Sequence, residues 1–286
     1  MDTREWEERG ALYARLEDLC LRADRGELCD TCFLSPRELY FARSYLSGKG
    51  IAYRAFGGYV EAERQRMYLL PDYLEGAGET KETDGASCLG WEQTLSEFGL
   101  ESDVTVLRIV GSGYRVLTHR DFLGSLLGLG LERSVLGDLC VDAQGKEALV
   151  FCDTAIAPFI EWELTKVAND TVKVHRPASG EWTIPPRRWE EIRDTVASER
   201  LDCVVAALCG LSREKARETV CGGLVEVNFE GEERPDRAVA VPALISVRGF
   251  GRYRVRSLAD RTKKGRLRLV AEKYLKGGGH RCNFGV

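Results

Sequence analysis

The chain has 286 residues, of which 44% are hydrophobic and 30% are charged, and its formal net charge is −4. This length suits two or three small domains, each burying its own core. No run of about 18 apolar residues occurs, and the charged N-terminal stretch MDTREWEERG lacks an apolar segment, so neither a membrane span nor a secretory signal is expected.

The charge is distributed unevenly along the chain. Residues 181–286 carry 21 Lys and Arg against 15 Asp and Glu, a net of +6, whereas residues 1–180 carry 20 and 30, a net of −10. Residues 248–281 are more basic still, with 12 basic and 2 acidic side chains. This split favours a C-terminal region that binds a polyanion, attached to a body with another role, although charge alone fits a solvated basic face equally well.

Residues 1–75 are predicted to form an N-terminal α/β domain with two helices. Apolar side chains recur at three- and four-residue steps over 3–22, which predicts the first helix. The second is expected to begin at SPRELYFARSYL, with Ser35 as the N-cap, Pro36 as the first helical residue and Glu38 as the partner in a capping box.

Two strands and a linker are predicted to follow these helices. The stretches IAYRAFGGY (51–59) and RMYLLPDY (66–73) are rich in aromatic and apolar residues, as strands are. The acidic, glycine-rich stretch near 75–88 then predicts a loop or linker.

Residues 88–178 are predicted to form a middle domain. Its expected elements are a strand at 104–111, a helix at 119–130, strands at 137–142 and 147–153, a helix at 156–167 and a strand at 171–175. This β-α-β-β-α-β order predicts a ferredoxin-like or RRM-like sandwich. Many RNA-binding domains share this topology, but the strands lack the aromatic run with which RNA-recognition motifs stack bases, so the fold alone does not assign a function.

A proline-marked linker, GEWTIPPRRWEE, leads into a third predicted domain at 182–286, which makes the whole chain an α+β, multidomain protein. Four apolar side chains at helical spacing predict a buried helix face that ends at Gly210; they are Leu201, Val204, Val205 and Leu208. Ser212 is expected to cap the next helix, Gly222 and Gly223 allow a left-handed exit from it, and strands follow.

Basic side chains in the first turns of that second helix oppose the helix dipole, which favours anions there. Arg213 and Arg217 are four residues apart and share one side, and a bound phosphate would relieve the conflict. The alternative is that the two arginines pair with Glu214 and Glu218 on an exposed helix. Taken together, the pattern favours phosphate binding.

Several stretches of this chain resemble a known family. The pattern RLDxxxxxxxGLSRxxARxxVxxGxVxVN, followed by ISVRGFGRYRV, is similar to an S4 RNA-binding domain, of the αL type, over about 198–256. FLSPRELYFARSYL, FGGYVEAERQRMYLLPDY and THRDFLGSLLGLGLERSVLGDL resemble the YlmH family of bacterial S4-domain proteins over most of the chain. The resemblance implies association with the large ribosomal subunit and quality control of stalled nascent chains, in which the protein holds peptidyl-tRNA on the subunit; cell division is a second association of the family.

The S4 resemblance also implies the residues that contact RNA phosphates, riboses and minor-groove edges. They are Arg200, Ser212, Arg213, Lys215, Arg217, Asn228, Arg248, Arg252 and Arg254. Arg200 could instead be a structural partner of Asp202, and Asn228 a turn residue. The chain departs from the S4 pattern at Pro242-Ala243, where a Gly-Asp turn is usual, so the shape of that turn is open.

Two further stretches are candidate RNA contacts. The basic tail DRTKKGRLRLVAEKYLKGGGHR, which includes Lys263 and Lys264, predicts a strand-and-arm extension with non-specific RNA affinity. In the middle domain, His119 and Arg120 begin a helix and are secondary candidates for RNA contact, although a capping role for Asp121 and a surface role for His119 are the commoner outcome.

No catalytic, metal or cofactor site is predicted. The three histidines are far apart in sequence, and no HExxH, GxSxG or P-loop spacing occurs. Cys29 and Cys32 form the one metal-like pair, but no second pair follows at ribbon spacing, so a structural role is favoured. The ten cysteines lie partly inside apolar runs, which predicts reduced thiols packed in the core of a cytoplasmic protein.

The sequence therefore predicts a cytoplasmic, monomeric, non-enzymatic protein that binds rRNA of the large ribosomal subunit, with tRNA as a second candidate contact. Two hypotheses from other classes stay open. One is an RNA-modifying enzyme with an unrecognised site in the front domains, and the other is a cell-division adaptor for which RNA binding is secondary.

Overall fold

The computed structural model describes residues 3–60, 62–77, 95, 102–178, 180–184, 189–262, 265–274 and 281–282. It divides into two compact units of mixed α/β structure. The N-terminal unit is Arg4–Pro186 with Gly277–Val286, and the C-terminal unit is Arg187–Lys276 with Met1–Thr3. Separate domains at 1–75 and 88–178 stay a prediction, and most of the predicted linker at 75–88 lies outside the described residues. Within the described ranges, no helix has the length and apolarity to cross a membrane.

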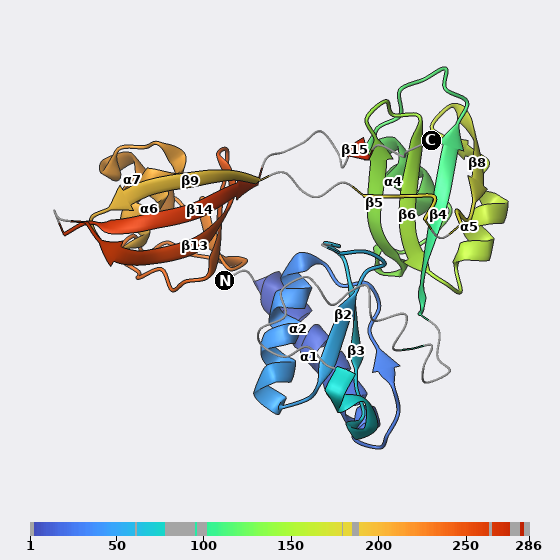
Figure 1. Ribbon diagram of the computed structural model, residues 1–286, viewed down its shortest axis with the longest axis horizontal. Helices are drawn as coiled ribbons and strands as arrows, with labels where there is room; N and C mark the ends of the chain where they lie inside the picture. The colour runs from blue at the N-terminus through green and yellow to red at the C-terminus, as the bar shows by residue number, and fades with distance from the viewer. Residues whose placement is uncertain are drawn as a thin grey trace. The chain divides into compact units, whose positions relative to one another are not determined.

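The first part of the N-terminal unit packs two helices on a small antiparallel sheet of order β1-β3-β2 (Figure 1). Its elements are α1 (Thr3–Ala23), β1 (Cys29–Asp30), α2 (Pro36–Lys49), β2 (Tyr53–Phe56), β3 (Arg66–Leu69) and the 3₁₀ helix η1 (Asp72–Ala77). The start of α2 is as predicted, because the Ser35 hydroxyl accepts the Glu38 amide at 3.3 Å and the Glu38 carboxylate accepts the Ser35 amide at 2.8 Å. Gly50 ends the helix with a left-handed φ of 73°.

The second part of the unit has the predicted β-α-β-β-α-β order. Its elements are β4 (Val104–Gly111), α4 (His119–Gly128), the 3₁₀ helix η3 (Arg133–Val135), β5 (Leu136–Asp142), β6 (Glu147–Asp153), α5 (Ala157–Glu163), β7 (Lys166–Val167) and β8 (Asp170–His175). The spatial order is β15-β5-β6-β4-β8-β7, in which the short β15 (Arg281–Cys282) joins one edge in parallel with β5. The four main strands lie in the order β5-β6-β4-β8 and pair antiparallel, as in a split βαβ sandwich.

The helix predicted at 156–167 is wrong at its C-terminal end. α5 stops at Glu163, and Lys166–Val167 instead pairs with the start of β8 as a hairpin. Ala168 takes a left-handed φ of 51° in the tight turn between them. The hairpin turn at Ala168 and Asn169 therefore overrides the apolar spacing that suggested a longer helix.

The two faces of the middle sheet are buried in different ways. Leu107, Ile109 and Val150 point towards α4 and α5 and pack with Phe122 and Ile160. The opposite face is covered by side chains from the first part of the same unit. Both faces of the sheet are thus in contact with protein.

Phe151 lies at the centre of that second face. Its ring contacts Tyr59 at 4.9 Å and Trp182 at 5.4 Å between centroids, and it belongs to a buried cluster with Phe33 and Tyr68. Gly58 makes the approach possible, because a Cβ at this position would lie 2.3 Å from the Phe151 ring. Residues 180–184, predicted as part of a linker, therefore lie against the sheet in this unit.

Polar contacts reinforce the same interface. The buried Asp138 carboxylate accepts the Tyr59 hydroxyl at 2.6 Å and the backbone amides of Glu63 and Arg64 at 2.7 and 3.0 Å. Arg66 in β3 binds Asp30 in β1 and Asp153 at the end of β6. These partners satisfy the buried charges that would otherwise oppose folding.

The C-terminal unit is a six-stranded antiparallel sheet of order β11-β10-β12-β13-β14-β9, with two helices on one face (Figure 1). Its elements are β9 (Trp189–Val196), α6 (Leu201–Cys209), α7 (Arg213–Cys221), β10 (Val225–Val227), β11 (Glu230–Gly231), β12 (Ala243–Val247), β13 (Gly251–Arg261) and β14 (Leu267–Tyr274). β12 begins directly after Pro242 and pairs with both β10 and β13, so the chain continues into the sheet despite the unusual Pro-Ala turn.

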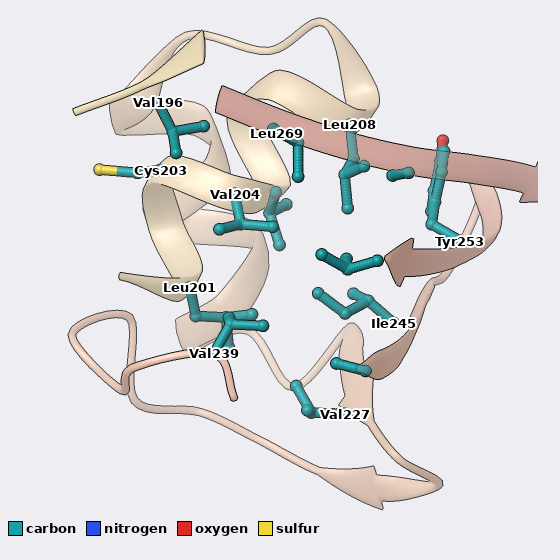
Figure 2. Packing of buried hydrophobic residues seen from close by; sticks show 14 of the residues in the cluster. Val196, Leu201, Cys203, Val204, Leu208, Val227, Val239, Ile245, Tyr253 and Leu269 are labelled. Carbon is teal, nitrogen blue, oxygen red and sulfur yellow. The ribbon is translucent and has the colours of Figure 1, made fainter. Parts of the chain in front are cut away.

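The core of this unit forms between the helices and the sheet. Figure 2 shows Leu201, Val204 and Leu208 of α6 directed at the strand residues Ile245 and Leu269. The four apolar positions predicted on α6 are all buried, as are Ala216 and Val220 of α7. Burial of this face fixes which sides of α6 and α7 remain exposed.

The basic tail was only partly predicted. Leu267–Tyr274 is not a peripheral arm but an interior strand, paired with β13 on one side and β9 on the other. Its residues Leu267, Leu269 and Ala271 are buried in the core. The alternation of apolar and polar side chains in RLRLVAEKY is the strand signal that the basic composition of the tail obscured.

Candidate nucleic-acid interface

The helix pair α6 and α7 carries most of the predicted contacts, and local sequence signals shape it. Gly210 ends α6 in a left-handed conformation with φ of 65°. Ser212 then caps α7, and its hydroxyl oxygen accepts the Lys215 amide at 3.2 Å. Both features are as predicted, and they place Arg213 at the first position of α7, beside the N-terminal turn of α6.

Asp202 joins Arg200 to Arg213. The Arg200 guanidinium donates to both carboxylate oxygens of Asp202 at 3.1 and 3.0 Å, and the Arg213 Nε lies 3.5 Å from the same carboxylate. Asp202 is only 2% exposed, whereas the side chain of Arg213 is 62% exposed. Two guanidinium groups share one carboxylate, so the cluster keeps a net positive charge and a fixed position on the surface.

The pKa of Asp202 reflects this arrangement. Burial acts to raise it, but the hydrogen bonds from Arg200 and the charges of both arginines outweigh burial and hold the pKa below its usual value. Arg200 is therefore a structural partner of Asp202, which is the alternative to direct RNA contact that the sequence left open. It leaves the exposed Arg213 as the more available cation.

The loop 232–239 supports the start of α6. The carbonyls of Arg237 and Pro235 accept the amides of Leu201 and Asp202 at 2.8 and 3.0 Å, which replaces a side-chain cap. The loop is itself held by Glu232, a 5% exposed residue whose carboxylate accepts the side chains of Arg234 and Arg237. No local sequence pattern predicts this long-range support of the Arg200–Asp202 cluster.

Glu232 predicts an acid sensitivity of this loop. Hydrogen bonds from Arg234 lower the pKa of Glu232 from 4.5 to about 2, although burial opposes them. The stabilisation is thus complete above pH 4.5 and is lost as the pH falls towards 2. Glu232→Gln is expected to lower the free energy of unfolding at neutral pH by about 1–3 kcal/mol. Urea titrations over a pH series measure the difference in unfolding free energy between Glu232→Gln and the unchanged protein. This difference should become smaller in acid, and a difference that stays constant would contradict this role of Glu232.

Lys215, Arg217 and Arg248 are exposed cations with no carboxylate in ion-pair range among the residues that the structure describes. The predicted alternative, in which the arginines of α7 pair with Glu214 and Glu218, is not what the structure shows. Arg248 lies beyond the other end of α7, since its amide donates to the Leu224 carbonyl at 2.9 Å. These three side chains are available to an anionic ligand.

Arg252 and Arg254 project from a different face. Their neighbours Tyr253 and Val255 point into the core beneath α6 and α7, and successive side chains of a strand alternate between faces. The Arg254 guanidinium lies 4.5 Å from the Trp189 ring centroid, and Arg252 lies 5.7 Å from that of Phe229. The structure therefore does not bring these two arginines together with those of α7.

Asn228 has a structural role in the turn after β10. It takes a left-handed φ of 53°, and its side-chain oxygen accepts the Leu244 amide at 2.8 Å. Its backbone amide donates to the Leu244 carbonyl at 2.7 Å. Its contact with RNA remains a prediction, and Lys263 and Lys264 lie outside the described residues.

A groove with a volume of about 380 Å³ borders Arg213. Small apolar side chains of α6 form one wall, and Arg266, which was predicted only as part of the basic tail, also lines it. Arg266 donates to the Thr195 hydroxyl at 3.0 Å and also to the Thr195 carbonyl, so it is fixed against β9. The sequence shows a basic residue just before the strand LRLVAEKY, but it does not show that this residue packs against β9.

The secondary candidates His119 and Arg120 lie in the N-terminal unit, in the first turn of α4. Thr118 is the N-cap and Asp121 completes a capping box, so the capping role considered for Asp121 is confirmed. Arg120 is exposed and His119 is partly buried. RNA contact by either residue stays a prediction.

The structure describes the side chains of eight cysteines, all free thiols, and five of them are buried. Cys29 lies in β1, and burial raises the pKa of its thiol. Among the described residues, no group of three or more His, Cys, Asp or Glu side chains could hold a metal ion.

Known proteins resemble this chain over most of its length. A family model described as "Putative RNA-binding domain in YlmH" matches residues 103–180. A protein of Bacillus subtilis (strain 168) with the name "Ribosome-associated protein quality control protein P2" is 31% identical over 243 residues, which is 85% of this chain and 86% of that protein. The solved structure "Cell division protein ylmH from Streptococcus pneumoniae" is 20% identical with a TM-score of 0.42, and the match covers 62% of this chain and 93% of that chain.

Proposed function

This chain belongs to the YlmH family, and from that membership we propose that it is an RNA-binding protein of the large ribosomal subunit. The similarity to a protein named for ribosome-associated quality control supports a role on stalled nascent chains in the cytoplasm. In this role the protein binds rRNA without catalysis, acts as a monomer, and has tRNA as a second contact.

The observation that carries the proposal is the exposed basic surface formed around α7. The C-terminal unit is proposed to be an S4-type RNA-binding domain, and the contacts of this surface are Ser212, Arg213, Lys215, Arg217 and Arg248. Arg200 supports it through Asp202. Phosphate oxygens accept charge-assisted hydrogen bonds from such guanidinium groups, and the contacts follow backbone shape more than base sequence.

A salt titration tests this proposal directly. The full chain is expected to bind purified large subunits with an affinity that falls linearly with salt on a double logarithmic plot, at a slope of roughly 0.9 for each phosphate neutralised. Sedimentation of the complex at rising potassium chloride gives this slope, and small subunits serve as the control. Failure to bind large subunits at low salt, or binding that does not respond to salt, would sink the proposal.

A further inference from the structure

The middle sheet cannot use its open face to bind RNA in this fold. RNA-recognition motifs stack bases on aromatic side chains of that face. Here the equivalent positions are Leu149 and Phe151, which are 0% and 1% exposed beneath Phe33, Tyr59 and Trp182. If residues 103–180 contact RNA, as the description of the matching family model suggests, the contact has to lie on another surface.

Two places in this part of the chain expose large aromatic side chains. On α5, Trp162 is 82% exposed and Phe159 is 42% exposed, but this short helix contains Glu161 and Glu163 and no basic residue, and the nearby Arg176 is already paired with Glu161. Carboxylates there would repel a polyanion. The charge of α5 therefore makes it a poor RNA surface.

The second place is the loop between β4 and α4. Tyr114 is 97% exposed at its tip, and Arg115 and Arg120 are exposed beside it. Hydrogen bonds from Thr118, and then the charges of Arg115 and Arg120, lower the pKa of Asp121. Asp121 is already used in the capping box, and the balance of charge on this loop is positive.

The loop is anchored at both ends, so Tyr114 is held in an outward position. The Gly111 amide donates to the Lys146 carbonyl at 2.8 Å, and the Ser112 amide donates to the carboxylate of Asp170 at 3.1 Å. At the other end Leu117 is buried, and its amide donates to the Gly145 carbonyl at 2.7 Å. A ring presented on such a short, fixed loop loses little conformational entropy when a base stacks on it.

We infer that Tyr114, Arg115 and Arg120 form a second RNA contact that binds an unpaired nucleotide. The base stacks on the Tyr114 ring, and the two arginines donate to the phosphates on either side of it. This site rests on the proposed function, because it assumes that the protein is bound to RNA. It is separate from the α7 surface, which belongs to the other unit.

The test uses the full chain bound to large subunits. Ultraviolet cross-linking followed by mass spectrometry is expected to join a nucleotide to the peptide that contains Tyr114. Affinity for a single-stranded uridine-rich oligonucleotide should fall about fivefold or more in Tyr114→Ala, because one stacked base is lost. Tyr114→Trp should keep the affinity, since its ring also stacks. Trp162→Ala, a matched change of an exposed aromatic on α5, should bind like the unchanged protein.

The outcomes separate this inference from the proposed function. Cross-links confined to the C-terminal unit, with normal oligonucleotide binding by Tyr114→Ala, would overturn the second contact and leave the α7 surface standing. A cross-link from Tyr114 to a ribosomal protein would overturn it in favour of a protein partner. Absence of binding to large subunits would remove both proposals together.

Discussion

Replacement of both Arg213 and Arg217 by alanine is expected to lower the affinity for large subunits by about ten- to hundredfold at low salt. Each guanidinium group that contacts a phosphate forms charge-assisted hydrogen bonds worth about 1.5–3 kcal/mol. In the variant, water molecules bond to the phosphate instead and offset part of this loss. The salt slope should also become shallower by up to about 2, because two phosphate contacts are lost. Filter binding or sedimentation over a salt series measures both quantities.

The two changes should leave the fold intact. Both side chains are exposed, and alanine favours a helix at least as well as arginine. Arg200 still neutralises the buried Asp202 after Arg213 is removed, through its bonds at 3.1 and 3.0 Å. Loss of binding would then report the surface and not unfolding.

The matched control removes the same charge from another place. Arg22 and Arg25 are exposed residues at the end of α1 and just beyond it, in the N-terminal unit. Arg22→Ala/Arg25→Ala changes the net charge equally, so it should weaken binding only slightly. Equal losses in the two double variants would mean that overall charge, and not the α7 surface, controls binding.

The second large effect is on stability. Arg66→Met is expected to lower the free energy of unfolding of the N-terminal unit by about 3–5 kcal/mol, the usual cost of breaking a buried ion pair from one side. The Arg66 side chain is 9% exposed and binds Asp30 and Asp153 at 2.5 and 2.7 Å. Without Arg66, the carboxylates of Asp30 and Asp153 have lost their positively charged partner at the contact between the small sheet and the middle sheet. Urea denaturation followed by circular dichroism measures the change.

Acid and a compensating variant provide the controls for Arg66. Burial, opposed by the charge of Arg66, already raises the pKa of Asp30. In Arg66→Met that opposition is gone, so Asp30 should take up a proton more readily and the loss of unfolding free energy should shrink as the pH falls. Asp30→Asn/Arg66→Met/Asp153→Asn should recover much of the stability. A loss below about 1 kcal/mol in Arg66→Met would show that the pair contributes little.

The helices and their ends were predictable because their signals are local. Ser35 and Glu38, three residues apart, predict the start of α2 through a capping box. Gly210 and Ser212 predict the end of α6 and the start of α7. The element order of the middle sheet follows from the same kind of short-range pattern. α5 is the exception, since the turn at Ala168 prevailed over apolar spacing.

The arrangement of the candidate site depended on contacts that sequence spacing does not reveal. GRYRVRSL shows that Arg252 and Arg254 alternate with Tyr253, but only the packed core shows that α6 and α7 cover the tyrosine side. Glu232 supports the Arg200–Asp202 cluster indirectly, because it holds the loop 232–239 whose carbonyls accept the first amides of α6. This loop lies about 30 residues after the cluster in the chain. Its carboxylate had no predicted partner in the sequence.

The covered face of the middle sheet has a practical consequence for anyone who prepares fragments of this protein. A piece trimmed to residues 102–178 would expose Leu149 and Phe151 to water, together with the hydrogen-bonding groups of Asp138. Apolar patches of this kind drive aggregation, so such a fragment is expected to be poorly soluble. One that keeps residues 3–184 retains the covering side chains and should remain dispersed.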